Sequence, residues 1–292
     1  MKEKKYVEIN QLSVFEFMSR FPDEDAAREY IASGRWPNGV KCVHCGHGDV
    51  WKINNGKLYT CKECRKQFTV RTGTVMEDSK LPLQKWIYAM YLMTVSRKSI
   101  SSIQLAKEIG VTQKSAWHMA HRIRESCRNA GLLSGVVEAD ETYIGGKEKN
   151  KHAKKRLKAG RGTVGKAIVF GVRSRNGEVR AMTIQGTTRE HLCDAIKKTV
   201  AEGSTLFTDD HSGYNGIRGT YQHTSVNHSG REYVKGNAHT NGIESFWSYA
   251  KFRFIKLRGV RKEKFLLHLK ECQWRFNHRE DNIHKLLLRS LR

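Results

Sequence analysis

The sequence has very little proline and no long apolar stretch. Only three of the 292 residues are proline, which argues against a chain that consists largely of linkers. No apolar run of about 18 residues occurs, and the mean hydropathy is −0.62, so insertion into a membrane is excluded. Residues 1–6 include three Lys but have no apolar segment behind them, so they do not form a secretory signal.

Acidic residues are scarce relative to basic ones. The chain has 29 Asp plus Glu against 53 Lys plus Arg, which gives a net charge of +24. An excess of this size favours a polyanionic partner, and nucleic acid and an anionic membrane are the two candidates. A hydrophobic fraction of 38% and six Trp argue against disorder, and the length allows one to three domains.

The cysteines indicate a metal site rather than a disulfide framework. There are seven, an odd number, and four of them form the pairs Cys42-x-x-Cys45 and Cys61-x-x-Cys64 with 15 residues between the pairs. This is the spacing of a zinc ribbon, in which two tight turns bring four thiolates to one structural Zn²⁺. The alternative is two unrelated, reduced Cys pairs.

The predicted ribbon lies in a first domain over residues 1–78, behind an N-terminal helical segment. Asn54-Asn55-Gly56 between two short apolar runs predicts a hairpin turn. Basic residues around the turn favour DNA as the partner, and the alternative is that they are ordinary solvated side chains. These residues are Lys52, Lys57, Lys62, Arg65 and Lys66.

Residues 79–130 predict a helix-turn-helix DNA-binding domain. A helix starts at Pro82, a second runs from residue 101 to a tight turn at Gly110, and a third is capped by Thr112. The third helix has a buried stripe of Ala116, Met119, Ala120 and Ile123. The residues expected to face the major groove are Lys114, His118, His121 and Arg122. The alternative is an ordinary helical hairpin.

Residues 131–292 predict an α/β domain. Strands are expected over 134–146, 166–175, 179–184 and 204–209, with helices over 188–200 and 241–255. Asn176-Gly177 is a hairpin signal between the second and third strands. This order is that of an RNase H-like fold, with a mixed five-stranded sheet and flanking helices.

Three acids occupy positions that such a fold brings together. Asp140 ends the first strand, Asp209 ends the fourth, and Glu244 lies on the late helix. Clustered carboxylates resist joint ionisation, and two Mg²⁺ or Mn²⁺ ions relieve that repulsion. Three neighbouring acids compete for these places: Glu138, which shares a strand face with Asp140, Glu141 and Asp210.

Basic residues accompany the acids. Lys251 follows Glu244 by two helical turns and lies on the same helix face, where it can hold a phosphate. The segment 147–161 contains eight Lys or Arg, including Lys154, Lys155 and Arg156, and is expected to bind DNA in a salt-dependent way. The alternative is a solvated loop.

Three segments together carry a resemblance to a known family. Residues 137–147 (VEADETYIGGK), 207–214 (FTDDHSGY) and 239–251 (HTNGIESFWSYAK) resemble bacterial insertion-sequence transposases of the DDE class. The most similar group has an N-terminal zinc ribbon and a helix-turn-helix before an RNase H-like catalytic core. The resemblance extends from about residue 15 to 285.

The resemblance implies a function and its residues. Asp140, Asp209 and Glu244 would be the metal-binding triad, with Lys251 as the accompanying basic residue. The protein would bind terminal inverted repeats and catalyse metal-dependent DNA strand cleavage and transfer, with one structural Zn²⁺ and two catalytic Mg²⁺ or Mn²⁺. Its partners would be double-stranded repeat and target DNA and, in the synaptic complex, a second copy or more. It would be cytoplasmic and nucleoid-associated in a bacterium.

Two other functions fit parts of the sequence. One is a domesticated regulator that binds DNA through the ribbon and the helix-turn-helix but has lost catalysis. The other is a structure-selective nuclease of the same fold, such as a junction resolvase. The second explains the acids but not the two DNA-reading modules.

Overall fold

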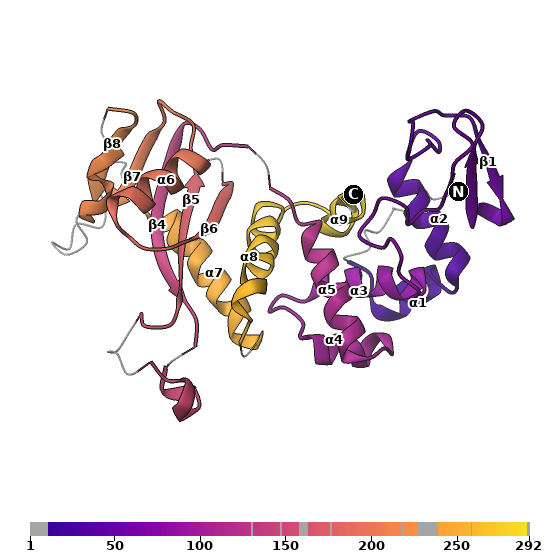
Figure 1. Ribbon diagram of the computed structural model, residues 1–292, viewed down its shortest axis with the longest axis horizontal. Coiled ribbons are helices and arrows are strands. Elements are labelled where there is room, and N and C mark those ends of the chain that lie inside the picture. Colours follow the sequence, from indigo (N-terminus) through magenta and orange to yellow (C-terminus); the bar gives the residue numbers. More distant parts are fainter. Residues whose placement is uncertain are drawn as a thin grey trace, which may run out of the picture. The chain divides into compact units, whose positions relative to one another are not determined.

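The computed structural model consists of two compact units (Figure 1). Unit 1 comprises Met1–Arg128 together with His278–Arg292, and unit 2 comprises Asn129–Asn277. The structure describes residues 11–129, 131–146, 148–157, 163–175, 177–217, 219–226, 239–257 and 259–290. Within these ranges no helix combines the length and the apolar character that a membrane crossing needs.

A three-stranded antiparallel sheet forms the ribbon part of unit 1. Its strands, in the order β1-β2-β3, are β1 (Val50–Ile53), β2 (Leu58–Cys61) and β3 (Gln67–Phe68). The predicted hairpin is present, because Ile53 pairs with Leu58 across the short helix η2 (Asn54–Gly56). Asn54 and Asn55 both have a positive φ, which asparagine tolerates better than most residues.

The other regular elements of unit 1, among the described residues, are mainly helices. They are α1 (Val14–Arg20), α2 (Glu24–Arg35), α3 (Leu83–Val95), α4 (Ser102–Ile109), α5 (Gln113–Glu125) and α9 (Ile283–Arg289). The predicted signals act as expected: Pro82 precedes α3, Gly110 ends α4 with a φ of 62°, and the Thr112 hydroxyl accepts from the Ser115 amide at 3.2 Å. The predicted stripe on α5 is buried.

Helix α9 belongs to unit 1, which differs from the predicted domain boundary. The sequence predicts an α/β domain that extends to residue 292, but α9 packs against α2 and α3 of unit 1. Leu288 lies so close to Gly34 that a Cβ on this glycine would be 2.4 Å from Leu288 Cδ2. His284 is fully buried, and its Nδ1 lies 3.1 Å from the Tyr30 hydroxyl. The apolar side chains of the tail therefore complete the core of unit 1.

Unit 2 is built on a mixed five-stranded sheet. The strand order is β6-β5-β4-β7-β8, with β4 antiparallel to β5, β5 antiparallel to β6, and β4, β7 and β8 parallel. The bounds are β4 (Val136–Ile144), β5 (Ala167–Ser174), β6 (Val179–Ile184), β7 (Thr205–Asp209) and β8 (Gln222–Val226). The predicted sheet of five strands with flanking helices is thus confirmed.

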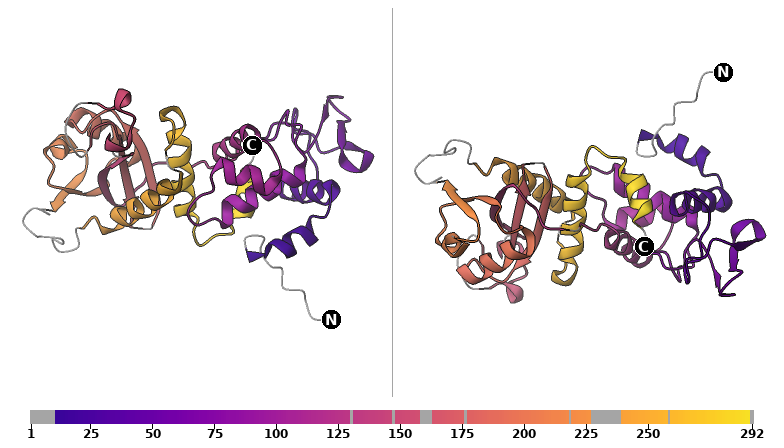
Figure 2. Two further views of the ribbon diagram at one scale, coloured as in Figure 1. Left: turned by 90° about the horizontal axis from the view of Figure 1, so that it is seen from below. Right: turned by 90° about the horizontal axis from the view of Figure 1, so that it is seen from above.

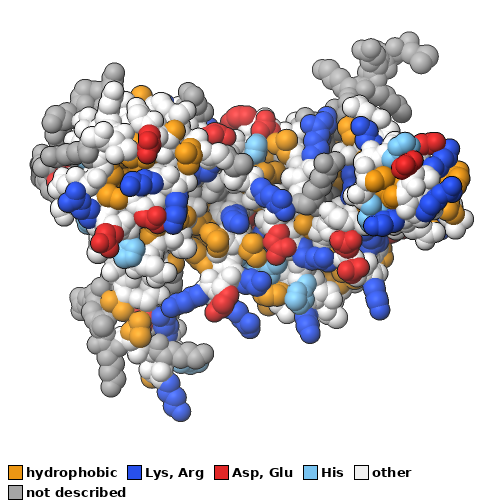
Figure 3. Space-filling model, turned by 45° about the horizontal axis from the view of Figure 1, so that its top comes forward, with side chains coloured by type: hydrophobic (Ala, Val, Ile, Leu, Met, Phe, Trp, Pro, Cys, Tyr) orange, Lys and Arg blue, Asp and Glu red, His pale blue; other side chains and the backbone are white. Residues whose placement is uncertain are grey.

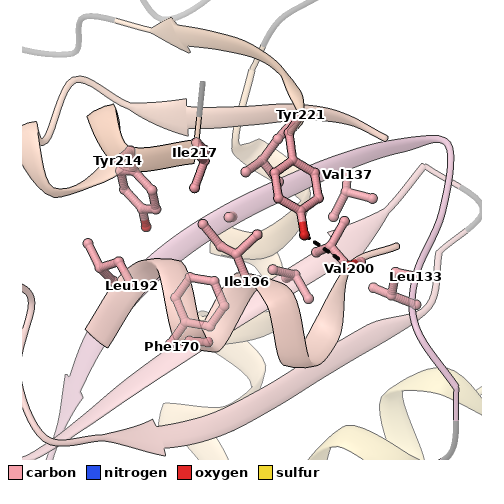
Figure 4. Packing of buried hydrophobic residues seen from close by; sticks show 13 residues of the cluster. Leu133, Val137, Phe170, Leu192, Ile196, Val200, Tyr214, Ile217 and Tyr221 are labelled. Atoms are coloured by element: carbon pink, nitrogen blue, oxygen red, sulfur yellow. Dashed lines mark hydrogen bonds between the residues drawn. The ribbon is translucent and has the colours of Figure 1, made fainter. Parts of the chain in front are cut away.

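Helices cover both faces of this sheet (Figures 1 and 2). Helix α6 (Arg189–Thr199) lies on one face, where Leu192 and Ile196 pack against Phe170 of β5 (Figure 4). Helices α7 (Asn241–Leu257) and α8 (Lys262–Asn277) cover the other face. Side chains of α8 also bind the edge strand β6. The Val179 amide donates to Asn277 Oδ1 at 2.8 Å, and the Ala181 amide donates to Gln273 Oε1 at 3.0 Å.

Three short helical turns, η3 (Glu148–Asn150), η4 (Ala153–Lys155) and η5 (Ser212–Ile217), lie in the connections of unit 2. The first two fall in the basic segment 147–161, of which Lys147 and residues 158–161 lie outside the described residues. Asn176 of the predicted hairpin turn also lies outside them, although the pairing of β5 with β6 confirms the hairpin.

Candidate functional site

The four predicted zinc ligands converge at one point of the ribbon. The Sγ atoms of Cys42, Cys45, Cys61 and Cys64 all lie within 4.8 Å of one another. Each pair sits on a tight turn: the Gly46 amide donates to the Cys42 carbonyl at 3.0 Å, and the Arg65 amide donates to the Cys61 carbonyl at 3.1 Å. Four thiols at this separation fit the tetrahedral coordination of a structural Zn²⁺.

The surroundings of Cys42 favour the thiolate that binds zinc. Burial of this thiol acts to raise its pKa, but hydrogen bonds from the backbone amides of Cys45 and His44, together with those from the thiols of Cys64 and Cys45, lower the pKa to about 6. Burial and the same sharing among the thiols raise the pKa of Cys45. The imidazole of His44 lies 3.3 Å from the Gln67 carbonyl oxygen. The four cysteines are therefore the residues that could hold a structural Zn²⁺.

A second cluster of possible ligands lies in unit 2. Asp140, Glu141 and Asp209, which we call the acid cluster, each place a carboxylate oxygen within 4.8 Å of the others. The prediction that Asp140 ends its strand is wrong, because β4 continues to Ile144 and carries both Asp140 and Glu141. Asp209 is the last residue of β7, the parallel neighbour of β4, as predicted. All three side chains are partly buried. The cluster brings together two acids of the predicted triad and one predicted competitor.

The environment of the acid cluster raises the pKa of two of its carboxyl groups and so disfavours their ionised forms. Burial, reinforced by the charges of Asp209 and Glu244, raises the pKa of Asp140 to about 6. Burial, reinforced by Asp209 and Asp140, raises the pKa of Glu141 to about 7, although the Tyr214 hydroxyl donates to its Oε2 at 2.6 Å. A divalent cation among these oxygens would favour the ionised forms, so the site suits a hard, positively charged ligand.

Glu244 and Lys251 lie on α7, outside the acid cluster. Glu244 is exposed, and its Oε1 accepts from the Thr240 hydroxyl at 3.2 Å just before the helix begins. Its charge nevertheless acts on the pKa of Asp140. Lys251 is exposed further along the same helix. Asp210, the alternative to Asp209, is exposed and is not part of the cluster.

Glu138 has a different role from its neighbour Asp140. Its side chain is buried, and its Oε2 accepts from the backbone amide of Ile243 in the first turn of α7 at 2.9 Å. Its Oε1 is 3.4 Å from Arg175 Nε. A Cβ on Gly242 would lie 2.5 Å from Glu138 Oε2, so only glycine lets this carboxylate reach the helix terminus. Glu138 thereby caps α7 and fixes its start against β4.

The predicted DNA-facing residues on α5 divide into two sets. Lys114 and His118 are exposed, as expected. The prediction that His121 faces outward is wrong: it is only 4% exposed, and its ring packs against Trp117 with 4.2 Å between the centroids. Arg122 is partly buried and donates to the Glu77 carbonyl at 2.8 Å. The buried arc of α5 is wider than the predicted stripe, because Trp117 and His121, one turn apart, pack edge to face.

The basic segment after β4 presents Lys154 and Arg156 at the surface. The side chain of Lys155 lies outside the described residues. Glu148 pairs with Lys151 and accepts from the Leu157 amide at 2.9 Å, which orders this part of the segment. On the face drawn in Figure 3, Lys and Arg side chains are interspersed with acidic ones.

Comparisons with known proteins place these features in a family. Residues 132–277 match the ISXO2-like transposase domain, and residues 22–67 match a transposase zinc-ribbon domain. The chain is therefore a transposase with an N-terminal zinc ribbon, and it belongs to the ISXO2-like transposase family.

Two curated relatives have similar sequences. An uncharacterized protein in the transposable element ISH50 of Halobacterium salinarum is 31% identical over 270 residues, which cover 87% of this chain and 91% of the relative. An uncharacterized transposase-like protein of Haemophilus influenzae is 33% identical over 104 residues, which cover 35% of this chain and 84% of the relative. Both relatives agree with the family assignment.

Proposed function

We propose that the protein binds the terminal inverted repeats of an insertion sequence and catalyses metal-dependent DNA strand cleavage and strand transfer, as a transposase of the DDE class. The observation that carries this proposal is the acid cluster, which lies on two adjacent parallel strands inside the transposase domain. Carboxylate oxygens with raised pKa values are suited to Mg²⁺ or Mn²⁺.

The architecture supports a division of labour between the two units. The strand order β6-β5-β4-β7-β8, with the acids on the two central parallel strands, agrees with an RNase H-like catalytic domain in unit 2. The helices α4 and α5, joined at Gly110 and capped at Thr112, agree with a helix-turn-helix in unit 1. Unit 1 would read the repeat, and unit 2 would carry out the chemistry.

Asp140, Asp209 and Glu244 are the proposed metal ligands, and Glu141 is a further acid placed to join them. When bound, two divalent ions would activate water or a 3′-hydroxyl and stabilise the leaving oxygen in an in-line displacement at phosphorus. Lys251, on the helix that carries Glu244, would hold a neighbouring phosphate. No covalent bond between protein and DNA is needed in this scheme.

Exposed basic side chains are the proposed contacts to DNA. They lie on α5, at Lys114 and His118, and in the segment after β4, at Lys154 and Arg156. The ribbon would add a second contact to the repeat. Cleavage at paired ends of an element requires two copies of the enzyme, so we propose that a homodimer or a larger assembly forms on DNA.

A cleavage assay tests the proposed function. The full-length protein is incubated with Mg²⁺ or Mn²⁺ and a duplex that carries the repeats flanking its own gene. We expect a nick that leaves a 3′-hydroxyl at the repeat boundary, and no nick in EDTA. Binding to the repeats without any metal-dependent nick would instead support a regulator that has lost catalysis, and cleavage of branched DNA in preference to the repeats would support a resolvase.

Metal should stabilise the protein more at high pH than at low pH. The raised pKa values of Asp140 and Glu141, about 6 and about 7, mean that the metal-free fold is favoured at low pH and loses that stability as pH rises through these values. Metal binds the ionised cluster, and a concentration 100 times the Kd stabilises the fold by about 2.7 kcal/mol. Melting curves with Mn²⁺ should therefore shift by several degrees at pH 8 and very little at pH 5. An equal shift at both pH values would contradict the acid cluster as the binding site.

A further inference from the structure

We propose that Trp247 is a positioning residue for the acid cluster, and that its indole N–H holds the Asp140 carboxylate in the orientation that binds metal. The inference rests on the proposed function, because it requires Asp140 to be a metal ligand. Trp247 lies on α7 one turn after Glu244, and its Nε1 donates to Asp140 Oδ2 at 3.0 Å.

Both oxygens of Asp140 are fixed by donors. The backbone amide of Glu141 donates to Oδ1 at 2.8 Å, while Trp247 donates to Oδ2. A carboxylate oxygen can accept more than one hydrogen bond, so each oxygen keeps a free direction for a cation. With both oxygens held, the carboxylate does not rotate about its terminal bond, and the free lone pairs keep a constant direction relative to Asp209.

The indole ring of Trp247 packs on the sheet above a glycine. Gly171 of β5 pairs directly with Asp140 of β4, so these two residues share the sheet face that α7 covers. A Cβ on Gly171 would lie 2.4 Å from Trp247 Cη2. The glycine therefore provides the space in which the ring reaches across β5 to the acid on the next strand. The side chain of Trp247 is almost fully buried there.

A hydrogen bond to β4 also holds the backbone of α7, close to Trp247. Glu138 accepts from the Ile243 amide, four residues before Trp247, and thereby anchors the helix to the strand that carries Asp140. The helix is thus attached to β4 twice, at its first turn through Glu138 and one turn later through Trp247. Packing alone does not explain the second attachment, because an apolar ring would fill the space above Gly171 without a donor.

Trp247→Phe separates the donor from the packing. It keeps an aromatic ring above Gly171 and removes the N–H. Partners that hydrogen-bond a metal ligand typically contribute about 10-fold to 100-fold to metal affinity or activity. We therefore expect the Mn²⁺ concentration for half-maximal cleavage to rise about 10-fold or more, and the Mn²⁺ affinity measured by calorimetry to fall by the same factor. Affinity for repeat DNA should not change.

A matched control is available in unit 1. Trp86 is equally buried, and its Nε1 donates to the Ser79 hydroxyl at 3.0 Å. Trp86→Phe removes a comparable indole hydrogen bond away from the acids, and it should leave the Mn²⁺ affinity at the wild-type value. If Trp247→Phe does not fold, Trp247 can be replaced with 3-benzothienylalanine, which keeps the bicyclic shape and lacks the N–H.

The outcomes distinguish this inference from the function on which it rests. If Asp140→Asn retains wild-type cleavage and Mn²⁺ binding, the proposed function itself is wrong. If Asp140→Asn loses both while Trp247→Phe, or the benzothienyl variant, binds Mn²⁺ with wild-type affinity, the function stands and the positioning role is overturned. A weaker Mn²⁺ affinity in the Trp247 variant, with the Trp86 variant unaffected, supports the positioning role.

Discussion

Asp140→Asn should abolish metal-dependent strand cleavage and leave binding to the terminal repeats unchanged. Asparagine has nearly the same shape, so the sheet should stay intact, but it removes the charge at the centre of the acid cluster. The loss should exceed the roughly 100-fold that removal of an indirect partner of a metal ligand costs. Cleavage of labelled repeat DNA measures the activity, and a gel shift measures binding.

Asp210→Asn is the matched control for this variant. Asp210 follows Asp209, is exposed and does not belong to the acid cluster, so its replacement should keep most of the activity. Inactivity of the Asp210 variant together with activity of an Asp209→Asn variant would reassign the second ligand. Loss of repeat binding in Asp140→Asn would argue against the separation of DNA reading from chemistry.

The second large effect concerns the ribbon. Cys61 is fully buried among the zinc thiols, and Cys61→Ser should abolish stoichiometric zinc and unfold the ribbon. Zinc contributes about 10–16 kcal/mol of apparent binding free energy to small structural sites, more than a three-stranded sheet of this size can replace. Repeat binding should weaken strongly, while Mn²⁺ binding by unit 2 should persist. Metal analysis of the purified protein and a gel shift provide the two measurements.

Cys193→Ser serves as the control for the zinc experiment. Cys193 lies on α6 in unit 2 and packs against a core cluster there, so its removal should leave one zinc per chain. A Cys61 variant that still holds one zinc per chain would contradict the ligand assignment.

Local signals in the sequence were sufficient for much of the fold. The Cys-x-x-Cys pairs predicted the ribbon, and the Gly110 turn with the Thr112 cap predicted where α4 ends and α5 begins. Strand β8 had no such signal, because it is a partly exposed edge strand with only Val226 fully buried. The packing of α9 against unit 1 was also not predictable, because the apolar side chains of a C-terminal helix do not indicate which of two cores they join.

The acid cluster was only partly predictable, because some of its contacts join residues that are far apart in sequence. Asp140 and Asp209 were predictable because each lies in or at the end of a strand. The sequence predicts Glu141 only as an alternative to Asp140, because side chains alternate along β4 and Glu141 points to the sheet face opposite Asp140. The register between β4 and β7 is what brings both carboxylates close to Asp209. The contact between Trp247 and Asp140 joins residues 107 positions apart, and the space for it depends on Gly171 of a third element.

The return of the chain into unit 1 has a consequence for synthesis and mutation. Unit 2 is one continuous stretch, but unit 1 is completed only by α9, which is translated after unit 2. A nascent chain can therefore finish its acid-bearing unit while its N-terminal unit still lacks Leu288, which packs against Gly34. A nonsense or frameshift mutation between the codons of unit 2 and those of α9 would then damage the N-terminal unit, about 250 residues away in sequence, and leave the acids in place.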